Sequence, residues 1–324
     1  MSDYLLDIEG MRVAIGSRRR GDREIVHGID LRVRSGETIG MVGESGSGKS
    51  VTMLAILRLL GDPLLLRGGR VLFRGRDLAA LSEAELRELR GRDIAMIYQD
   101  PMTSLNPLMR VGDQVREVLL VHGIEREEAD RRVLELFARV GIPDPARTAR
   151  SYPHEFSGGM RQRVVIAMAL ALKPALLIAD EPTTALDVTI QQQILALVAE
   201  LKEEMGMTTI WVTHDLGVVA RLVERVIVMY GGTIVEDAPV EQLFAHPQHP
   251  YTQLLLASLP DASDESRPPL AQIPGRPPLP GEQITGCPFR DRCPQARAIC
   301  ETTPELVPRG AGAAACWVPP EEWT

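Results

Sequence analysis

Hydrophobic and polar residues alternate with a strand-like period at the start of the chain. Short runs of β-type residues occur at Leu5–Ile8, Arg12–Ile15 and Gly28–Val33, and charged turns separate them. This alternation predicts a small antiparallel sheet. The mainly apolar run Thr38–Val42 comes next and predicts a buried strand.

Helical spacing replaces this pattern further along the chain. Val51–Leu60 contains neither Pro nor Gly and has helical spacing, and from about Leu81 to Lys173 the pattern changes to helix. Ser82-Glu83-Ala84-Glu85 resembles a capped helix start. Gln114–His122 and Glu125–Val140 carry apolar residues three and four positions apart, which predicts two amphipathic helices.

Strand-like runs return in the second half of the chain. They lie at Ala175–Ala179, Thr208–Val212 and Arg225–Met229, and helical patterns separate them. This order is typical of a parallel α/β sheet. Gly231-Gly232 then predicts a turn between two closing strands.

Composition changes sharply after this region. Seven prolines and few apolar residues lie between Pro260 and Pro280, as in an extended linker, and all four cysteines come after it. We therefore expect a large α/β domain over residues 1–260, with a helical subdomain at about residues 92–172. A proline-rich linker over residues 261–285 and a cysteine-rich module over residues 286–324 would follow.

One glycine-rich octapeptide carries the clearest chemical signal, because it lies between a predicted strand and a predicted helix. Such a loop turns its backbone N–H groups toward a polyphosphate, and its glycines permit the close approach. Lys49 would reach the β/γ-phosphates, and the Ser50 hydroxyl would take a place on Mg²⁺. A glycine-rich turn without a ligand is the alternative. The octapeptide consists of Gly43, Glu44, Ser45, Gly46, Ser47, Gly48, Lys49 and Ser50.

The apolar run that begins at Leu176 ends in two carboxylates, Asp180 and Glu181. Asp180 suits a ligand on the Mg²⁺ side, often through water, and Glu181 suits the base that polarises an attacking water. The alternative, a strand that simply ends in acidic turn residues, is less favoured because the phosphate-binding loop is present.

A second anion site is predicted at Ser157-Gly158-Gly159, directly before the helical pattern Arg161–Leu172. A nucleotide held by one chain needs no second cradle, whereas a nucleotide held between two chains does. Considered alone, this segment would be a plain capped helix.

Two further polar residues are weaker candidates. His214 follows a β-branched strand and would hydrogen-bond a γ-phosphate, although a histidine there is usually just a polar strand end. Gln99 lies where the core-type sequence gives way to the helical insert, a suitable place for a nucleotide sensor, and a surface glutamine is the alternative.

Charge and hydropathy exclude two classes of protein. The formal net charge of −8 and the pI near 5.4 argue against a nucleic-acid binder, which usually has a basic face. The longest unbroken apolar stretch, Val164–Leu172, is far shorter than the roughly 20 residues of a spanning helix. Any membrane association is therefore expected to come through a partner.

These motifs, in this order, resemble the ATP-binding subunits of ABC transporters over about residues 5–260. The resemblance implies an α/β P-loop NTPase fold of the ABC type, with a mixed core sheet, an antiparallel β subdomain, a helical subdomain and a small Cys-rich C-terminal extension. It implies that ATP is bound with Mg²⁺, and that Glu181, His214 and Gln99 act in catalysis. The matching segments are Walker A at Gly43–Ser50, the Q-loop at Gln99, the signature at Ser157–Arg161, Walker B at Leu176–Asp180, the D-loop at Thr184–Asp187 and the switch at His214. The implied Mg²⁺ contacts are Ser50, Gln99 and Asp180.

Three segments resemble the importers of oligopeptides, dipeptides and nickel, namely Gln99–Pro107, Tyr152–Met160 and His249–Thr252. Met160 resembles the D-type ATPase of this family. The resemblance implies an F-type ATP-binding partner, two membrane permeases, an extracytoplasmic solute-binding protein and a place on the cytoplasmic face of the inner membrane. It implies ATP-driven uptake of di- or oligopeptides, with nickel or another solute as the alternative. A soluble ABC-type ATPase that is not coupled to transport is the alternative from another class.

One position departs from the family pattern. Members usually stack adenine on an aromatic residue shortly after the first strand, and this chain has Ile15 at the expected place. ATP as the nucleotide therefore depends on the resemblance alone.

The four cysteines have spacings unlike the short paired hooks of most zinc modules. Four buried free thiols are one interpretation, and a redox sensor is another. The segment resembles the C-terminal motif of peptide-importer ATPases, which implies a [4Fe–4S] cluster, with Zn²⁺ as the alternative. The residues concerned are Cys287, Cys293, Cys300 and Cys316.

Overall fold

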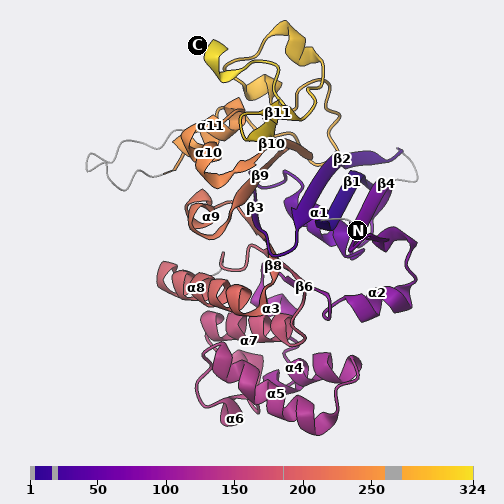
Figure 1. Ribbon diagram of the computed structural model, residues 1–324, viewed down its shortest axis with the longest axis vertical. Helices are drawn as coiled ribbons and strands as arrows, with labels where there is room; N and C mark the ends of the chain where they lie inside the picture. Colours follow the sequence, from indigo (N-terminus) through magenta and orange to yellow (C-terminus); the bar gives the residue numbers. More distant parts are fainter. Residues whose placement is uncertain (1–3, 17–20, 185, 260–271, 324) are drawn as a thin grey trace. The chain divides into compact units, whose positions relative to one another are not determined.

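The computed structural model describes residues 4–16, 21–184, 186–259 and 272–323 and forms two compact units (Figure 1). The first unit comprises Met1–Arg34, Thr38–Ala79 and Trp211–Thr324, and the second comprises Ser35–Glu37 and Ala80–Ile210. Residues 260–271, which include most of the first half of the expected linker, lie outside the described part. Ala185 of the expected D-loop lies outside it as well.

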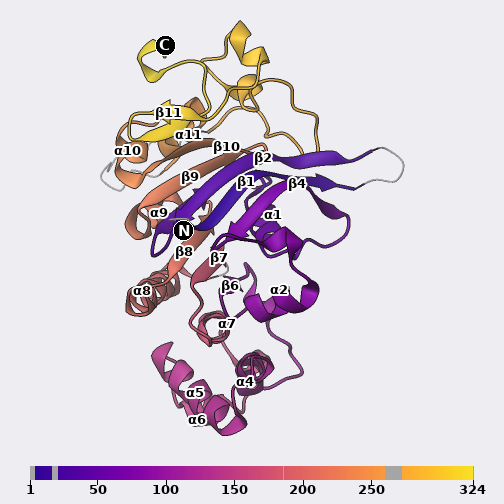
Figure 2. The ribbon, with the colours of Figure 1, turned by 45° about the vertical axis from the view of Figure 1, so that its right-hand side comes forward.

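The first unit contains the predicted antiparallel sheet, in the order β2-β1-β4-β5 (Figure 2). The runs Leu5–Ile8 and Arg12–Ile15 belong to one strand, because the register shifts between Ile8 and Met11 and Gly10 adopts φ 57°. Such a bulge lets a strand continue past an irregular residue. The strands are β1 (Tyr4–Ile15), β2 (Arg23–Arg34), β4 (Leu64–Phe73) and β5 (Arg76–Asp77).

A second set of strands in the first unit carries the phosphate-binding loop. Strand β3 (Thr38–Val42) is buried at every residue and pairs in parallel with β9 (Arg225–Tyr230). Strand β9 turns at Gly231-Gly232 into the antiparallel β10 (Thr233–Pro239), which confirms the predicted turn. The cysteine-rich segment adds two short strands at β10, namely β12 (Gly312–Ala314) and then β11 (Val307–Arg309).

The helices of the first unit are short. Helix α1 follows the phosphate-binding loop and ends earlier than the predicted Leu60, because Leu57 is its C-cap and Arg58 adopts φ 51°. The helices are α1 (Lys49–Ile56), α9 (Leu216–Leu222), α10 (Val240–Ala245) and α11 (Pro250–Ala257). The chain passes between the two units within β8 (Thr208–Thr213).

The second unit contains most of the helices and two parallel strands. The capping box at Ser82 is confirmed, since Ser82 accepts from the Glu85 backbone N–H and donates its own backbone N–H to the Glu85 carboxylate. The helical pattern expected from about Leu81 to Lys173 is interrupted by β6 (Ile94–Ile97), which pairs with β7 (Leu176–Asp180). The helices are α2 (Glu83–Leu89), α3 (Pro101–Ser104), α4 (Val111–Val121), α5 (Arg126–Arg139), α6 (Pro145–Thr148), α7 (Gly158–Leu170) and α8 (Val188–Met205). Among the described residues, no helix combines the length and hydropathy needed to cross a bilayer.

Candidate functional site

The glycine-rich octapeptide forms a loop between β3 and α1, as the sequence predicts. Gly46 and Gly48 adopt left-handed backbone angles, φ 82° and φ 101°, and Gly48 is the N-cap of α1. Gly43 has no room for a side chain, since a Cβ there would lie 2.2 Å from the backbone oxygen of Met229. This tight, left-handed loop at a helix N-terminus is the geometry that receives phosphate groups.

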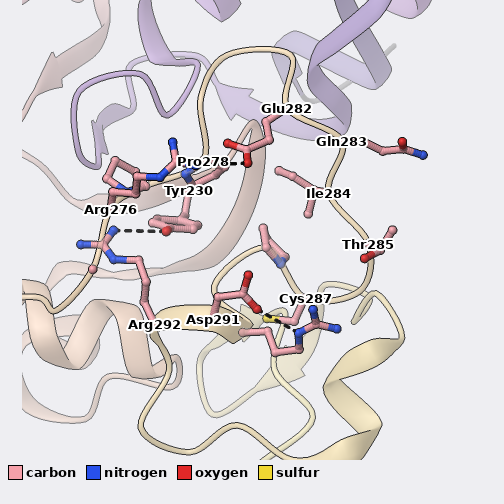
Figure 3. Close-up of a pocket in the computed structure, with 14 residues that line it drawn as sticks. Tyr230, Arg276, Pro278, Glu282, Gln283, Ile284, Thr285, Cys287, Asp291 and Arg292 are labelled. Atoms are coloured by element: carbon pink, nitrogen blue, oxygen red, sulfur yellow. Dashed lines mark hydrogen bonds and ion pairs between the residues drawn. The ribbon is translucent and has the colours of Figure 1, made fainter.

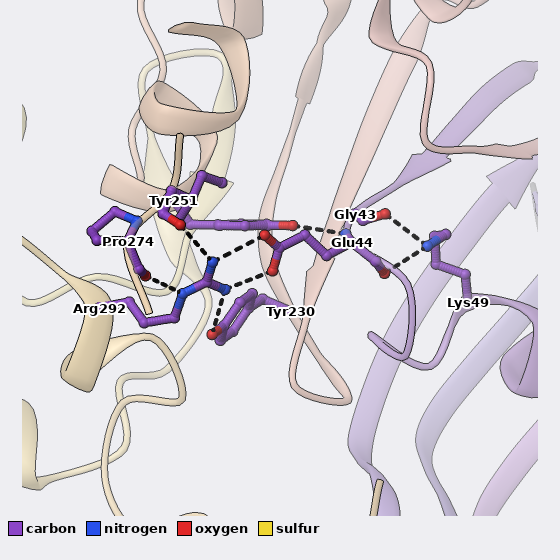
Figure 4. A network of polar contacts seen from close by, with 8 residues as sticks. Gly43, Glu44, Lys49, Tyr230, Tyr251, Pro274 and Arg292 are labelled. Carbon is purple, nitrogen blue, oxygen red and sulfur yellow. Dashed lines mark hydrogen bonds and ion pairs between the residues drawn. The ribbon is translucent and has the colours of Figure 1, made fainter. Parts of the chain in front are cut away.

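The lysine of the loop is buried and points back over the backbone (Figure 4). Its Nζ donates to the carbonyl oxygens of Gly43 at 2.7 Å and Glu44 at 2.9 Å, and contacts the Ser47 hydroxyl at 3.4 Å. The Ser47 carbonyl in turn accepts from the Gly232 N–H at 3.0 Å. Lys49 therefore lies within the cradle, where a cation is needed for a polyphosphate.

Two of the predicted catalytic residues meet in the second unit. Because β6 and β7 run in parallel, with Ile97 opposite Ala179, the residues that follow each strand lie at the same edge. Gln99 Nε2 donates to Glu181 Oε2 at 3.1 Å. Asp180, at the end of β7, is buried.

Glu181 has an unusual backbone, with φ 45°. A left-handed non-glycine residue costs on the order of 1–3 kcal/mol, and such residues concentrate at functional sites. Thr184 supports it, because the Thr184 hydroxyl donates to Glu181 Oε2 at 2.9 Å. This contact is not evident from the sequence, although Thr184 lies only three positions after Glu181 in the expected D-loop.

The predicted second anion site forms the start of α7. Ser157 is the N-cap and accepts from the Met160 N–H at 3.3 Å. The two glycines that follow lie close to the D-loop and α8, since a Cβ on Gly158 would come within 3.4 Å of the Leu186 side chain and one on Gly159 within 2.8 Å of the Ile190 side chain. Asp187, the last residue of the D-loop, caps α8 by accepting from the Ile190 N–H at 3.0 Å. The signature segment and the D-loop are therefore neighbours within the second unit.

His214 lies directly after β8 in the first unit, and its side chain is exposed. Its neighbours fix the turn, because the Asp215 N–H donates to the Thr213 hydroxyl at 3.0 Å and Asp215 caps α9. An exposed imidazole at this turn is accessible to a phosphate group. Its role as the switch residue stays a prediction.

The predicted metal cluster of the C-terminal module is wrong. Within the described part of the chain, no group of three or more His, Cys, Asp or Glu side chains is arranged to hold a metal ion. Burial raises the pKa of Cys287 to about 12 and the pKa of Cys293 to about 11. The arrangement of these side chains therefore corrects the expected [4Fe–4S] cluster and its Zn²⁺ alternative, and all four cysteines are free of disulfide bonds.

These thiols are expected to react slowly with alkylating reagents. At about pH 7.5, iodoacetamide should label Cys287 and Cys293 in the native protein roughly ten- to a hundredfold more slowly than an unperturbed cysteine, because so little thiolate is present. Mass spectrometry of the labelled peptides measures the rates, and urea-unfolded protein provides the control. Labelling of both thiols at the unfolded rate would contradict the prediction.

A buried ionisable pair lies beside α11. Glu236 accepts from the backbone N–H groups of Gln248 at 2.8 Å and His249 at 3.0 Å, and burial raises its pKa to about 7. His249 caps α11, since its Nδ1 accepts from the Tyr251 N–H at 3.0 Å. Burial, and then the charge of Arg309, lower the pKa of His249 to about 3.

The two shifts act on stability in opposite directions. The unfolded histidine takes up its proton below pH 6.5 and the folded one only near pH 3, so His249 makes stability rise with pH across that interval. Folded Glu236 keeps its proton up to about pH 7 and unfolded Glu236 only to 4.5, so it makes stability fall as pH rises. The two effects oppose each other between pH 4.5 and 6.5.

The variant His249→Asn is expected to expose the Glu236 effect, because asparagine can still cap α11. As the pH rises from 4.5 to 6.5, the free energy of unfolding of this variant should decrease by about 3 kcal/mol more than that of the wild type, in which the two effects oppose each other. Urea unfolding across this range measures the difference. His154→Asn, at an exposed histidine, is the matched control. Parallel pH profiles for His249→Asn and the wild type would contradict the prediction.

Comparisons with known proteins agree with this geometry. A family profile described as "ABC transporter" matches residues 26–184, and one described as "Oligopeptide/dipeptide transporter, C-terminal region" matches residues 235–300. The chain is 52% identical over 320 residues to the probable peptide ABC transporter ATP-binding protein y4tR of Sinorhizobium fredii, covering 98% of this chain and 95% of that protein. It is 47% identical over 323 residues to the oligopeptide transport ATP-binding protein OppD of Salmonella typhimurium, covering 99% and 96%.

Among solved structures, the chain is similar to the dimeric, post-hydrolysis state of the ATP-binding cassette MJ0796 bound to ADP and Pi. The TM-score is 0.65 at 28% identity, over 72% of this chain and 98% of that chain. The α/β P-loop fold with mixed sheets that the sequence predicts is confirmed by this match.

Proposed function

The chain belongs to the ATP-binding subunits of ABC transporters, and we propose that it hydrolyses ATP to power the uptake of di- or oligopeptides through partner permeases. The observation that carries the proposal is the Glu181 carboxylate, fixed by Gln99 and Thr184 at the end of β7. A carboxylate fixed in this way, in a chain with a phosphate-binding loop, is equipped to polarise water for phosphoryl transfer.

The loop Gly43–Ser50 binds the phosphates of ATP through backbone N–H groups and the Lys49 ammonium. Lys49 and His214 neutralise charge on the γ-phosphate, while Glu181 polarises the attacking water. Ser50, Gln99 and Asp180 offer hydroxyl, amide and carboxylate oxygens, the ligand types that Mg²⁺ prefers, and the bound ion would offset phosphate charge. Adenine packs against Ile15, and ATP rather than GTP is the nucleotide.

Two ATP-binding chains act together in this proposal. ATP lies between the Gly43–Ser50 loop of one chain and the Ser157, Gly158 and Gly159 segment of the other, and an F-type subunit is the second chain. Both work with two permeases and an extracytoplasmic solute-binding protein, at the cytoplasmic face of the inner membrane. Residues 1–260 form the ATP-binding domain, residues 261–285 the linker, and residues 286–324 a small C-terminal extension.

Reconstitution tests the proposal. The chain, its F-type partner, the permeases and the binding protein are placed in lipid vesicles, and uptake of labelled peptides is measured with and without ATP. We expect ATP-dependent peptide uptake that GTP supports poorly and that stops in Lys49→Ala vesicles. Uptake of nickel but not of peptide would show that nickel, the alternative solute, is the substrate. Hydrolysis without any association with permeases would favour a soluble ATPase.

A further inference from the structure

The second residue of the phosphate-binding loop is held by residues distant in the sequence (Figure 4). Arg292 Nη1 donates to Glu44 Oε2 at 2.6 Å, and Arg292 Nη2 donates to Glu44 Oε1 at 3.1 Å. The Glu44 backbone N–H donates to the Tyr251 hydroxyl at 2.8 Å. Glu44 is therefore fixed through both its side chain and its backbone by residues of α11 and the C-terminal segment.

The Arg292 guanidinium uses all three of its nitrogen atoms. Besides the two bonds to Glu44, Nη1 donates to the Tyr230 hydroxyl at 3.1 Å, Nε to the Pro274 carbonyl at 2.7 Å and Nη2 to the Ile273 carbonyl at 3.3 Å. The side chain is only 5% exposed. A buried, bidentate arginine–carboxylate pair with its donors satisfied is geometrically specific and costly to break from one side.

Aromatic rings form the base of this contact. The Arg292 guanidinium lies 5.7 Å from the centre of the Tyr230 ring and 5.9 Å from that of Phe289. Tyr230, Tyr251 and Phe289 pack on one another with ring centres 4.7 to 5.3 Å apart, and all three are buried. This packing restricts the rotamers of the two tyrosines and of Arg292, and so holds the two hydroxyl groups and the guanidinium in place.

A pocket lies beside Arg292 in the same unit (Figure 3). Its lining includes Tyr230, Arg276, Glu282 and Cys287, and Arg276 forms an ion pair with Glu282 at 3.6 Å within it. Arg292 also lines this pocket and donates to the carbonyls of residues 273 and 274. Arg292 thus joins three parts of the first unit, namely the loop, the end of β9 and the chain after residue 271.

Glu44 is also the residue whose carbonyl accepts from Lys49. When Lys49 turns to a phosphate, the loop loses this internal contact and depends on its other anchors to keep its shape. A loop that is already held in the binding conformation loses less conformational entropy on binding, which strengthens affinity.

We propose that Arg292 is a positioning residue for ATP, through which the C-terminal extension holds the phosphate-binding loop ready by its ion pair with Glu44. The inference depends on the proposed function, because it requires the loop to bind ATP. Arg292 touches no part of the nucleotide itself and acts through Glu44. The extension is therefore part of the nucleotide site, and loss of the ion pair weakens ATP affinity without slowing turnover at saturation.

A double-mutant cycle on the full-length chain tests this. Arg292→Gln, Glu44→Gln and the double variant are compared with the wild type for ATP binding, by displacement of a fluorescent ATP analogue. Each single variant should bind ATP about tenfold more weakly, and the double variant about as weakly as either single one. In the assembled transporter, kcat of Arg292→Gln at saturating ATP should stay within about twofold of the wild type, so that the effect of this variant lies in KM. Arg292→Lys keeps the charge without the fork and should be intermediate.

Arg290→Gln is the matched control, because Arg290 is a neighbouring arginine paired with the exposed Asp291. It should bind ATP as the wild type does. If Arg292→Gln does not fold, the ATP affinity of Glu44→Gln alone tests the inference. That change removes the ion pair at Glu44, the more exposed of the two partners. A Glu44→Gln variant with wild-type affinity, or single effects that multiply in the double variant, would overturn the inference. A wild type that binds no ATP would overturn the proposed function instead.

Discussion

ATP turnover of the Glu181→Gln variant is expected to fall at least about a hundredfold, with ATP binding retained. Glutamine keeps the size of the side chain and still accepts from Thr184, but it cannot polarise water as a carboxylate does. Phosphate release by the assembled transporter measures turnover, and displacement of a fluorescent ATP analogue measures binding.

Glu203→Gln is a suitable control for this prediction. Its side chain is 77% exposed on α8 of the same unit, so turnover should be unchanged. Near-normal hydrolysis by Glu181→Gln would remove Glu181 from its catalytic role. Loss of ATP binding together with hydrolysis would instead point to a structural role for the strained residue at φ 45°.

The second large effect is expected at Gly43, where no side chain fits. A Cβ would lie 2.2 Å from the Met229 carbonyl oxygen and 2.9 Å from the Ser47 hydroxyl, and the backbone angle is φ 150°. Gly43→Ala must therefore displace either β9 or the phosphate-binding loop. We expect a loss of about 3 kcal/mol or more in the free energy of unfolding, together with loss of ATP binding.

Chemical denaturation and ATP binding measure this effect. Gly61→Ala is the matched control, because nothing lies within 4 Å of a Cβ there and its φ is ordinary. The control should differ from the wild type by less than about 0.5 kcal/mol. A Gly43→Ala variant as stable as the control, with ATP binding intact, would contradict the described packing of the loop against β9.

The phosphate-binding loop and the capped helices could be predicted from the sequence because a few neighbouring residues specify each of them. Glycines at fixed positions, a lysine, and a serine followed by glutamate three positions later specify backbone geometry directly. Strand β6 was not predicted, because a run of four mostly buried residues is too short to show a period that distinguishes a strand from a helix. Strand β4 was not predicted either, because Gly68, Gly69 and the arginines of this strand interrupt the alternation of apolar and polar residues.

Long-range contacts were beyond the sequence. Arg292 and Glu44 are 248 positions apart, and nothing near either residue indicates that they pair. The cysteines gave a misleading signal, since four thiols in a short segment suggest ligands, whereas no group of three or more His, Cys, Asp or Glu side chains in the described part of the chain is arranged to hold a metal ion. Whether such side chains are arranged as metal ligands depends on how the chain folds, which the spacing of the cysteines does not specify.

The most direct test of the account is whether ATP brings two ATP-binding chains together. The Glu181→Gln variant of the chain is mixed with its F-type partner and saturating Mg-ATP, and light scattering then measures the mass of the particles. The account predicts a dimer that forms with ATP and separates when ATP is removed, and that does not form when Ser157 is replaced by arginine. Chains that remain separate at saturating ATP would contradict it.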